Sequence, residues 1–62
     1  MTRFEIIVYS RSTGDVRHSS ANYHTQTAAE KELQKAGFTQ NQRLPDIWYS
    51  EKYYAKVKEI VP

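Results

Sequence analysis

Only a few side chains in this sequence could take part in catalysis or metal binding, and the two histidines come first. His18 and His24 lie six positions apart, the chain has no cysteine, and no carboxylate stands between them. A protein metal site needs three or four ligands at defined spacing. The sequence therefore predicts no metal and no cofactor, and both histidines are expected at the surface or rim of the fold.

A hydrolytic triad is also a poor fit to the sequence. Ser19 and Ser20 adjoin His18, and Asp15 is close by, but successive strand residues point to opposite faces. Nearness in sequence therefore assembles no triad, which is defined by geometry in space. Asp15 has a sufficient role as a turn former beside a glycine. We expect a protein that is not an enzyme.

Aromatic and arginine side chains give the sequence the composition of a binding surface. Such residues dominate interface hot spots, because rigid rings bury much area at low entropy cost and arginine supplies planar hydrogen bonding. The candidate partner-binding residues are Tyr9, Arg11, Arg17, Trp48, Tyr49, Tyr53 and Tyr54. Single-stranded nucleic acid is the second choice of partner, through base stacking and phosphate contact. The chain has no RNP-type run, so we favour a protein partner.

The length and charge of the chain limit what else it can be. Sixty-two residues make one domain, residues 1–62, with a core near the lower limit for folding unaided. Without disulfides, self-association as a homodimer or binding to a partner is the remaining way to add stability. The net charge of +2 excludes a histone-like polycation and an acidic mimic of DNA.

The N-terminal segment indicates a cytoplasmic protein. Residues 3–11 alternate like a strand and lack the apolar block and cleavage site of a signal peptide. No stretch approaches the roughly 20 apolar residues of a membrane helix. We expect a complete, cytoplasmic chain with no membrane partner.

Three elements are predicted before residue 40. Residues 3–11 and 16–23 alternate as strands, joined by a turn in which Gly14 can take a positive φ. Residues 26–36 are predicted to form a helix, with Thr25 or Thr27 as its N-cap and Gly37 ending it in the left-handed conformation. The polar segment "TQNQRLPD" is expected to be a loop.

The C-terminal segment "PDIWYSEKYYAKVKEIVP" fits either one amphipathic helix or a hairpin. Its periodicity allows both, but its β-branched and aromatic residues favour strands at 46–50 and 53–60. The predicted fold is α+β, a single small domain in which a four-stranded antiparallel sheet carries one helix on one face, in the order β-β-α-β-β. The core is expected to contain Phe4, Ile6, Val8, Ala29, Leu33, Ala36, Phe38 and Val57.

The run "HTQTAAEKELQKAGF…WYSEKYYAKVKEI" carries a resemblance, over residues 23–61, to small uncharacterised proteins of phages and other mobile elements. Among these are β-β-α-β-β inhibitors of bacterial defence systems, including anti-CRISPR proteins. The resemblance implies a class, namely compact, cysteine-free, non-catalytic proteins that bind and block a larger macromolecule. On this basis the expected function is that of a phage-type inhibitor of a host defence protein or complex, acting in the cytoplasm of the bacterial host.

Overall fold

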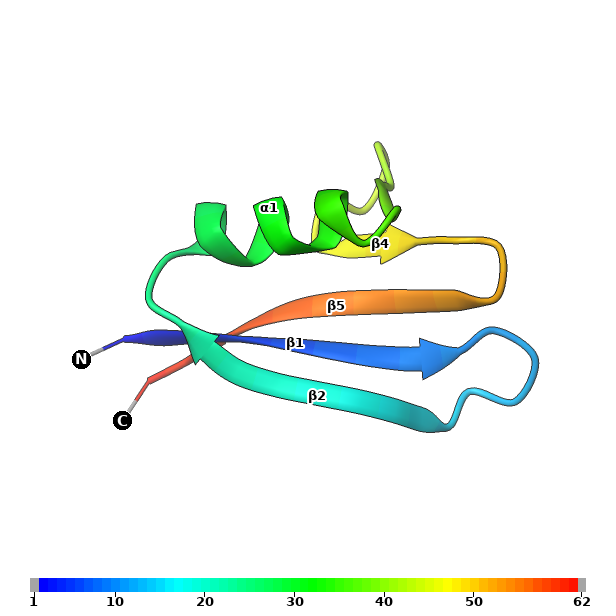
Figure 1. Cartoon of the computed structure of the whole chain (residues 1–62), viewed down its shortest axis with the longest axis horizontal. Coiled ribbons are helices and arrows are strands. Elements are labelled where there is room, and N and C mark those ends of the chain that lie inside the picture. The colour runs from blue at the N-terminus through cyan, green and yellow to red at the C-terminus, as the bar shows by residue number, and fades with distance from the viewer. Residues whose placement is uncertain (1, 62) are drawn as a thin grey trace.

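The computed structural model describes residues 2–61, which form one antiparallel sheet and one helix (Figure 1). The elements are β1 (Arg3–Ser10), β2 (Val16–Tyr23), α1 (Gln26–Lys35), β3 (Thr39–Gln40), β4 (Ile47–Tyr49) and β5 (Tyr53–Ile60). The strands lie in the order β2-β1-β5-β4-β3, and each neighbouring pair is antiparallel. The long strands β1 and β5 therefore occupy the centre of the sheet.

The predicted α+β fold is confirmed, but the sheet has five strands instead of four. The additional strand, β3, lies in the polar segment that was expected to be a loop, and its two residues pair with Tyr49 and Trp48 of β4. Two polar residues carry no hydrophobic alternation that could mark them as a strand. The C-terminal segment is the β4–β5 hairpin, and the alternative of a single helix is wrong.

Both ends of α1 are closed by the residues that the sequence indicates. Thr25 is the N-cap, and its hydroxyl accepts a hydrogen bond of 3.1 Å from the backbone N–H of Ala28. At the other end Gly37 has a φ of +91°, its N–H donates to the carbonyl of Gln34, and the N–H of Phe38 donates to the carbonyl of Leu33. These two bonds form a Schellman motif, which stops the helix and turns the chain toward β3.

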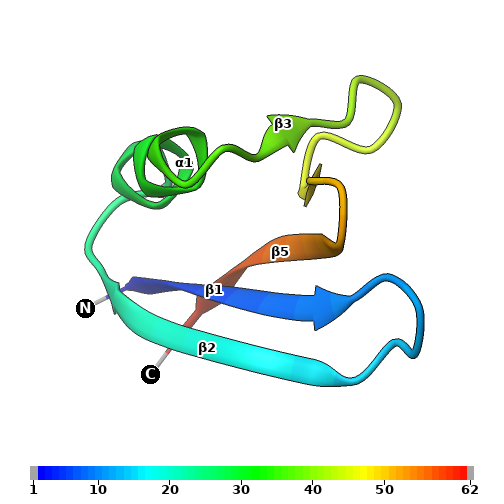
Figure 2. The ribbon, with the colours of Figure 1, turned by 45° about the vertical axis from the view of Figure 1, so that its right-hand side comes forward.

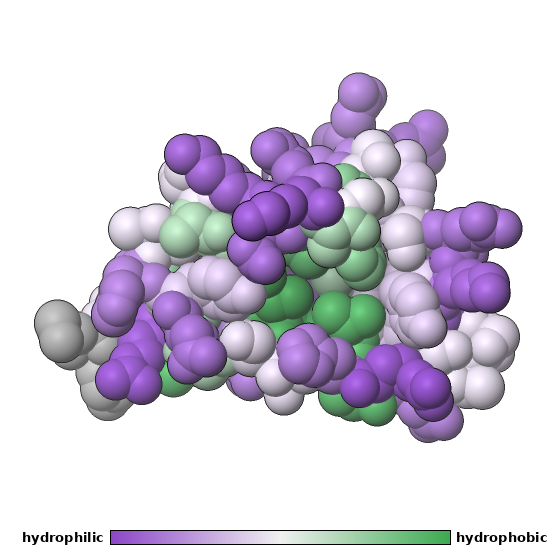
Figure 3. All heavy atoms as spheres, viewed as in Figure 1, coloured by the Kyte–Doolittle hydropathy of each residue, from purple (hydrophilic) through white to green (hydrophobic). Residues whose placement is uncertain are grey.

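The helix covers one face of the sheet, which Figures 1 and 2 show from two directions. Between helix and sheet lie the buried residues Ile6, Ala29, Leu33, Trp48 and Ala55, with Phe4, Val8, Tyr23, Phe38 and Val57 packed against them. A helix of ten residues with one apolar stripe cannot cover the whole of this face. Hydrophobic surface consequently remains visible between the helix and the strands, whereas the helix itself is hydrophilic outside (Figure 3).

The observed core adds Trp48 and Ala55 to the predicted one and lacks Ala36. Ala36, which was expected in the core from its spacing after Ala29 and Leu33, is exposed. It is the C-cap residue of α1, where the chain already leaves the helix for the turn at Gly37. The helix ends at Lys35, so the helical periodicity that predicted burial of Ala36 does not extend to this residue.

Candidate protein-binding face

The pairing of the strands assigns each side chain to one of the two faces of the sheet. Ile6 lies opposite Val57, and Val8 lies opposite Ala55, so these residues share the face under α1. Their neighbours along each strand must point to the other side. We call that side the open face, because no element within residues 2–61 packs over it. On β1, β4 and β5 its apolar and aromatic members are Ile7, Tyr9, Ile47, Tyr49, Tyr54 and Ile60, and Val16 of β2 lies opposite Tyr9.

Two tyrosines stack on each other on the open face, near the turn end of β1 and β5. Tyr9 and Tyr54 lie directly opposite on β1 and β5, their ring centroids are 4.8 Å apart, and the rings are inclined by only 13°. The ammonium nitrogen of Lys56 lies 5.8 Å from the centroid of the Tyr9 ring. Each ring thus covers one face of the other, and a cation approaches the pair. This packing holds the side chains in place without a second layer of structure.

Tyr49 extends the open face toward the short strands. It lies opposite Tyr54 on β4 and keeps 42% of its surface exposed. Three of the predicted partner-binding residues, Tyr9, Tyr49 and Tyr54, therefore form one row across β1, β5 and β4.

Trp48 and Tyr53 do not belong to this row, against the expectation from the sequence. Trp48 is only 2% exposed, because its pairing with Ala55 turns it into the core beneath α1. Its indole nitrogen is buried without a hydrogen-bond partner, so this side chain is a packing residue. Tyr53 lies opposite Ser10 and shares the face of Ala55 and Val57, although it remains 38% exposed.

The two predicted arginines lie at the turn end of the sheet. The guanidinium of Arg11 donates to the carbonyls of Ser50 and Glu51, at 2.8 and 3.4 Å, and its backbone N–H donates to the carbonyl of Lys52. Arg11 therefore ties the end of β1 to the β4–β5 turn, whose residues contain no glycine. Arg17 lines a second hollow of about 480 Å³, whose lining includes Arg11 and Tyr53 but not Tyr49.

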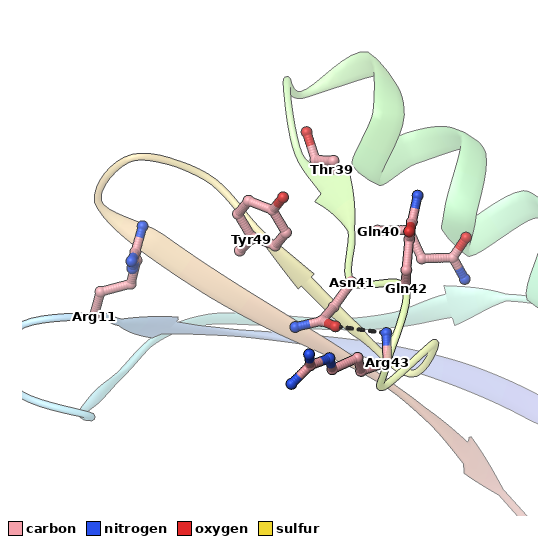
Figure 4. Close-up of a pocket in the computed structure, with 7 residues that line it drawn as sticks. All are labelled: Arg11, Thr39, Gln40, Asn41, Gln42, Arg43 and Tyr49. Carbon is pink, nitrogen blue, oxygen red and sulfur yellow. Dashed lines mark hydrogen bonds between the residues drawn. The ribbon is translucent and has the colours of Figure 1, made fainter.

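A hollow of about 590 Å³ adjoins the open face at Tyr49 (Figure 4). Its wall includes Arg11, Thr39, Asn41, Gln42, Arg43 and Tyr49, and none of the described residues that line it is acidic. The loop after β3 is shaped by Asn41, whose side-chain oxygen accepts hydrogen bonds from the backbone N–H groups of Arg43 and Leu44, at 2.9 and 3.2 Å. This loop brings Arg43 to the same hollow as Arg11.

The charges of the sheet are divided unequally between its faces. Among the strand residues placed by the β1–β5 pairing, Arg3, Lys56 and Lys58 lie on the open face against one carboxylate, Glu5. Glu59 lies on the opposite side, beside Asp46, in a small hollow under the start of α1. The cation beside the tyrosines is thus Lys56, whereas Arg3 and Lys58 lie toward the other end of β1 and β5, next to Glu5.

The sequence contains a signal for part of this arrangement, but not for the hollow. Because Val57 was expected in the core, strand alternation alone places Tyr53 with it and Tyr54 on the other side. No pattern in the sequence predicts that Arg43, Thr39 and Asn41 line a hollow with Tyr49. The order of the strands brings them together.

The histidines and the acidic groups form no metal centre in the part of the chain that the structure describes. His18 and His24 are both exposed. Across residues 2–61 no group of three or more histidine, cysteine or acidic side chains could hold a metal ion. In the same range no helix combines the length and the apolar character needed to span a bilayer.

Comparisons of this chain with protein-family models, with curated proteins and with solved structures give no match. The open face and the hollow beside it are therefore the features from which a function can be inferred.

Proposed function

We propose that this protein is a non-enzymatic binding module that docks a protein partner on the open face of its sheet. The observation that supports the proposal is the row of Tyr9, Tyr54 and Tyr49, flanked by isoleucines on a face that α1 does not cover. Tyrosine is enriched at interface hot spots because it combines a large rigid contact area with a polar end. Exposed apolar patches bordered by polar residues mark such sites.

The charge of the face defines the partner's chemistry. Lys56 lies beside the tyrosines and opposite Ile7, and Lys58 and Arg3 lie farther along the same face toward Ile60, so a complementary surface combines apolar and acidic residues. Opposite charges at the rim of an interface mainly raise the association rate and exclude partners of the wrong sign. The same argument disfavours face-to-face pairing of two copies, which would bring their lysines together. A homodimer is therefore the alternative occupant, not the preferred one.

Nucleic acid is the second candidate, because lysines beside tyrosines on a sheet also suit single strands. Base stacking needs vacant ring faces, however, and Tyr9 and Tyr54 lie against each other at 4.8 Å. Of the three tyrosines in the row, Tyr49 is the exposed one, at 42%, and would be the main stacking platform. The geometry for this reason favours the protein partner.

The resemblance to small inhibitors of bacterial defence gives a first partner to test. Those proteins bind and block larger complexes without catalysis, which agrees with a docking face in a chain of this size. We therefore propose a phage-type inhibitor that acts in the bacterial cytoplasm on a host defence complex.

Two tyrosines of similar exposure on opposite faces provide a matched pair of variants for the test. Tyr49 is 42% exposed on the open face, and Tyr53 is 38% exposed on the other. The chain, Tyr49→Ala and Tyr53→Ala would each be immobilised and incubated with bacterial lysate, with and without nuclease, then washed at low and high salt. We expect a protein that the chain and Tyr53→Ala retain at high salt and that Tyr49→Ala loses.

Three results would contradict the proposal. Equal loss in both variants would show that docking does not use the open face. Recovery of nucleic acid alone would favour base stacking, with affinity falling by about 0.7–0.9 log units per log unit of salt for each phosphate contacted. A dimer in sedimentation at micromolar concentration that Tyr49→Glu dissociates would identify a second copy as the occupant.

A further inference from the structure

The hollow beside Tyr49 is a convergence of hydrogen-bond donors from parts of the chain that are distant in sequence. Arg11 comes from the end of β1, Tyr49 from β4, and Asn41 and Arg43 from the loop after β3. In Figure 4 the guanidinium of Arg43 and the side-chain amide of Asn41 point to the side on which Arg11 lies. The ring of Tyr49 stands over the space between them.

Internal hydrogen bonds determine which atoms the hollow presents. The side-chain oxygen of Asn41 is used by the backbone N–H groups of Arg43 and Leu44, so its NH₂ group is the part that remains for a ligand. The backbone N–H of Asn41 donates to the carbonyl of Ile47 at 2.9 Å, which closes the loop at its base. The loop is thus shaped before any ligand arrives.

Arg11 is also held in place by the fold. One of its terminal nitrogens, Nη1, donates to the carbonyls of Ser50 and Glu51. A guanidinium has five N–H donors, so donors beyond these bonds are left for a ligand in the hollow. Because the side chain is already ordered, a ligand there would meet a cation whose rotamer entropy has been lost in folding.

We propose that this hollow binds acidic side chains of the protein partner, with Arg43 and Asn41 on one side and Arg11 on the other. The inference rests on the proposed function, since Tyr49 belongs both to the hollow and to the open face. Guanidinium groups match the planar, two-oxygen geometry of a carboxylate, and the lining residues add donors but no competing acid. A phosphate shares part of this chemistry, but the stacked tyrosines argue against a nucleic acid on the adjoining face.

The experiment needs no identified partner. The ¹⁵N-labelled chain is titrated with tetraglutamate and, separately, with a thymidylate oligonucleotide of equal charge, while amide and arginine Nε–H signals are followed by NMR. We expect saturable shifts with tetraglutamate confined to Arg11, the loop residues 41–44 and Tyr49. Arg43→Gln should weaken tetraglutamate binding about three- to fivefold, in line with an exposed ion pair. The matched control Lys35→Gln removes one cation from the exposed side of α1 and should leave binding unchanged.

The contrary outcomes are distinct. Shifts spread over Lys56, Lys58 and the helix, or equal weakening by Arg43→Gln and Lys35→Gln, would show a diffuse charge effect and overturn the inference. Tighter binding of the oligonucleotide at the same residues would assign the hollow to phosphate and overturn the carboxylate. If the titration fails while the capture of a partner still depends on Tyr49, the inference alone is wrong and the docking face stands.

Discussion

Trp48 and Tyr49 are adjacent in the sequence, yet they lie on the two faces of the sheet and in different environments. Trp48 is 2% exposed beneath α1, whereas Tyr49 is 42% exposed on the open face. On the covered face, large side chains are buried by a second layer. On the open face, Tyr9 and Tyr54 are held by stacking on each other. The difference shows that one short helix can complete only one face, and that the other keeps its aromatic side chains accessible to a partner.

Truncation of Trp48 and of Tyr49 tests this comparison most severely. Trp48→Ala should lower the free energy of unfolding by about 3–5 kcal/mol, as is usual for a buried aromatic side chain. Tyr49→Ala should change it by less than about 1 kcal/mol, because little packing is lost at a surface position. Urea unfolding followed by far-ultraviolet circular dichroism measures both without depending on tryptophan fluorescence. Equal costs would show that the two faces are packed alike.

A second pair of variants compares a buried leucine on the sheet-facing side of α1 with an exposed leucine in a loop. Leu33→Ala should destabilise the fold by about 2–5 kcal/mol, since Leu33 is buried between the helix and the sheet. Leu44, which is 56% exposed in the loop after β3, should tolerate the same change within about 0.5 kcal/mol. Thermal or urea unfolding of each variant measures the change in the free energy of unfolding. If Leu33→Ala costs nothing, the helix does not cover the sheet as described.

The cap of α1 is expected to contribute less than its buried side chains. Thr25→Ala removes the hydroxyl that accepts from Ala28 and should cost about 1 kcal/mol. Thr27→Ala, inside the first turn, should stay within about 0.5 kcal/mol, because Ala has the higher helix propensity. The helical signal and the unfolding midpoint of both variants would be compared. A larger loss of stability in Thr27→Ala than in Thr25→Ala would show that Thr27, and not Thr25, is the N-cap.

The smallest expected effect is the coupling free energy between the two stacked tyrosines of the open face. A double-mutant cycle on Tyr9 and Tyr54, each changed to Ala, should give a coupling free energy of about 0.5–1.5 kcal/mol. The same cycle on Tyr9 and Tyr53, which lie on opposite faces, should give a value near zero. Coupling in the second cycle but not in the first would mean that the stacked pair is not formed in solution.

Local patterns in the sequence were sufficient to predict the helix, the region of its two ends, and the four long or aromatic strands. Each depends on interactions within a few residues, such as the Thr25 cap, the positive φ of Gly37 and the alternation along β1 and β5. These preferences act before any distant contact forms, so they can be read from the chain itself. Because the sequence predicts one short helix with one narrow apolar stripe, it also implied that one face of the sheet would stay uncovered.

Tertiary pairing decided what lies on each face. Alternation requires Trp48 and Tyr49 to point to opposite sides, but only the pairing of Trp48 with Ala55 turns the tryptophan inward. The two residues of β3 become a strand because β4 presents an edge to them, not because of their own preference. The hollow between Arg11 and Arg43 likewise exists only because the strand order joins segments about thirty residues apart. Contacts between distant segments leave no local periodicity, so the structure alone could reveal them.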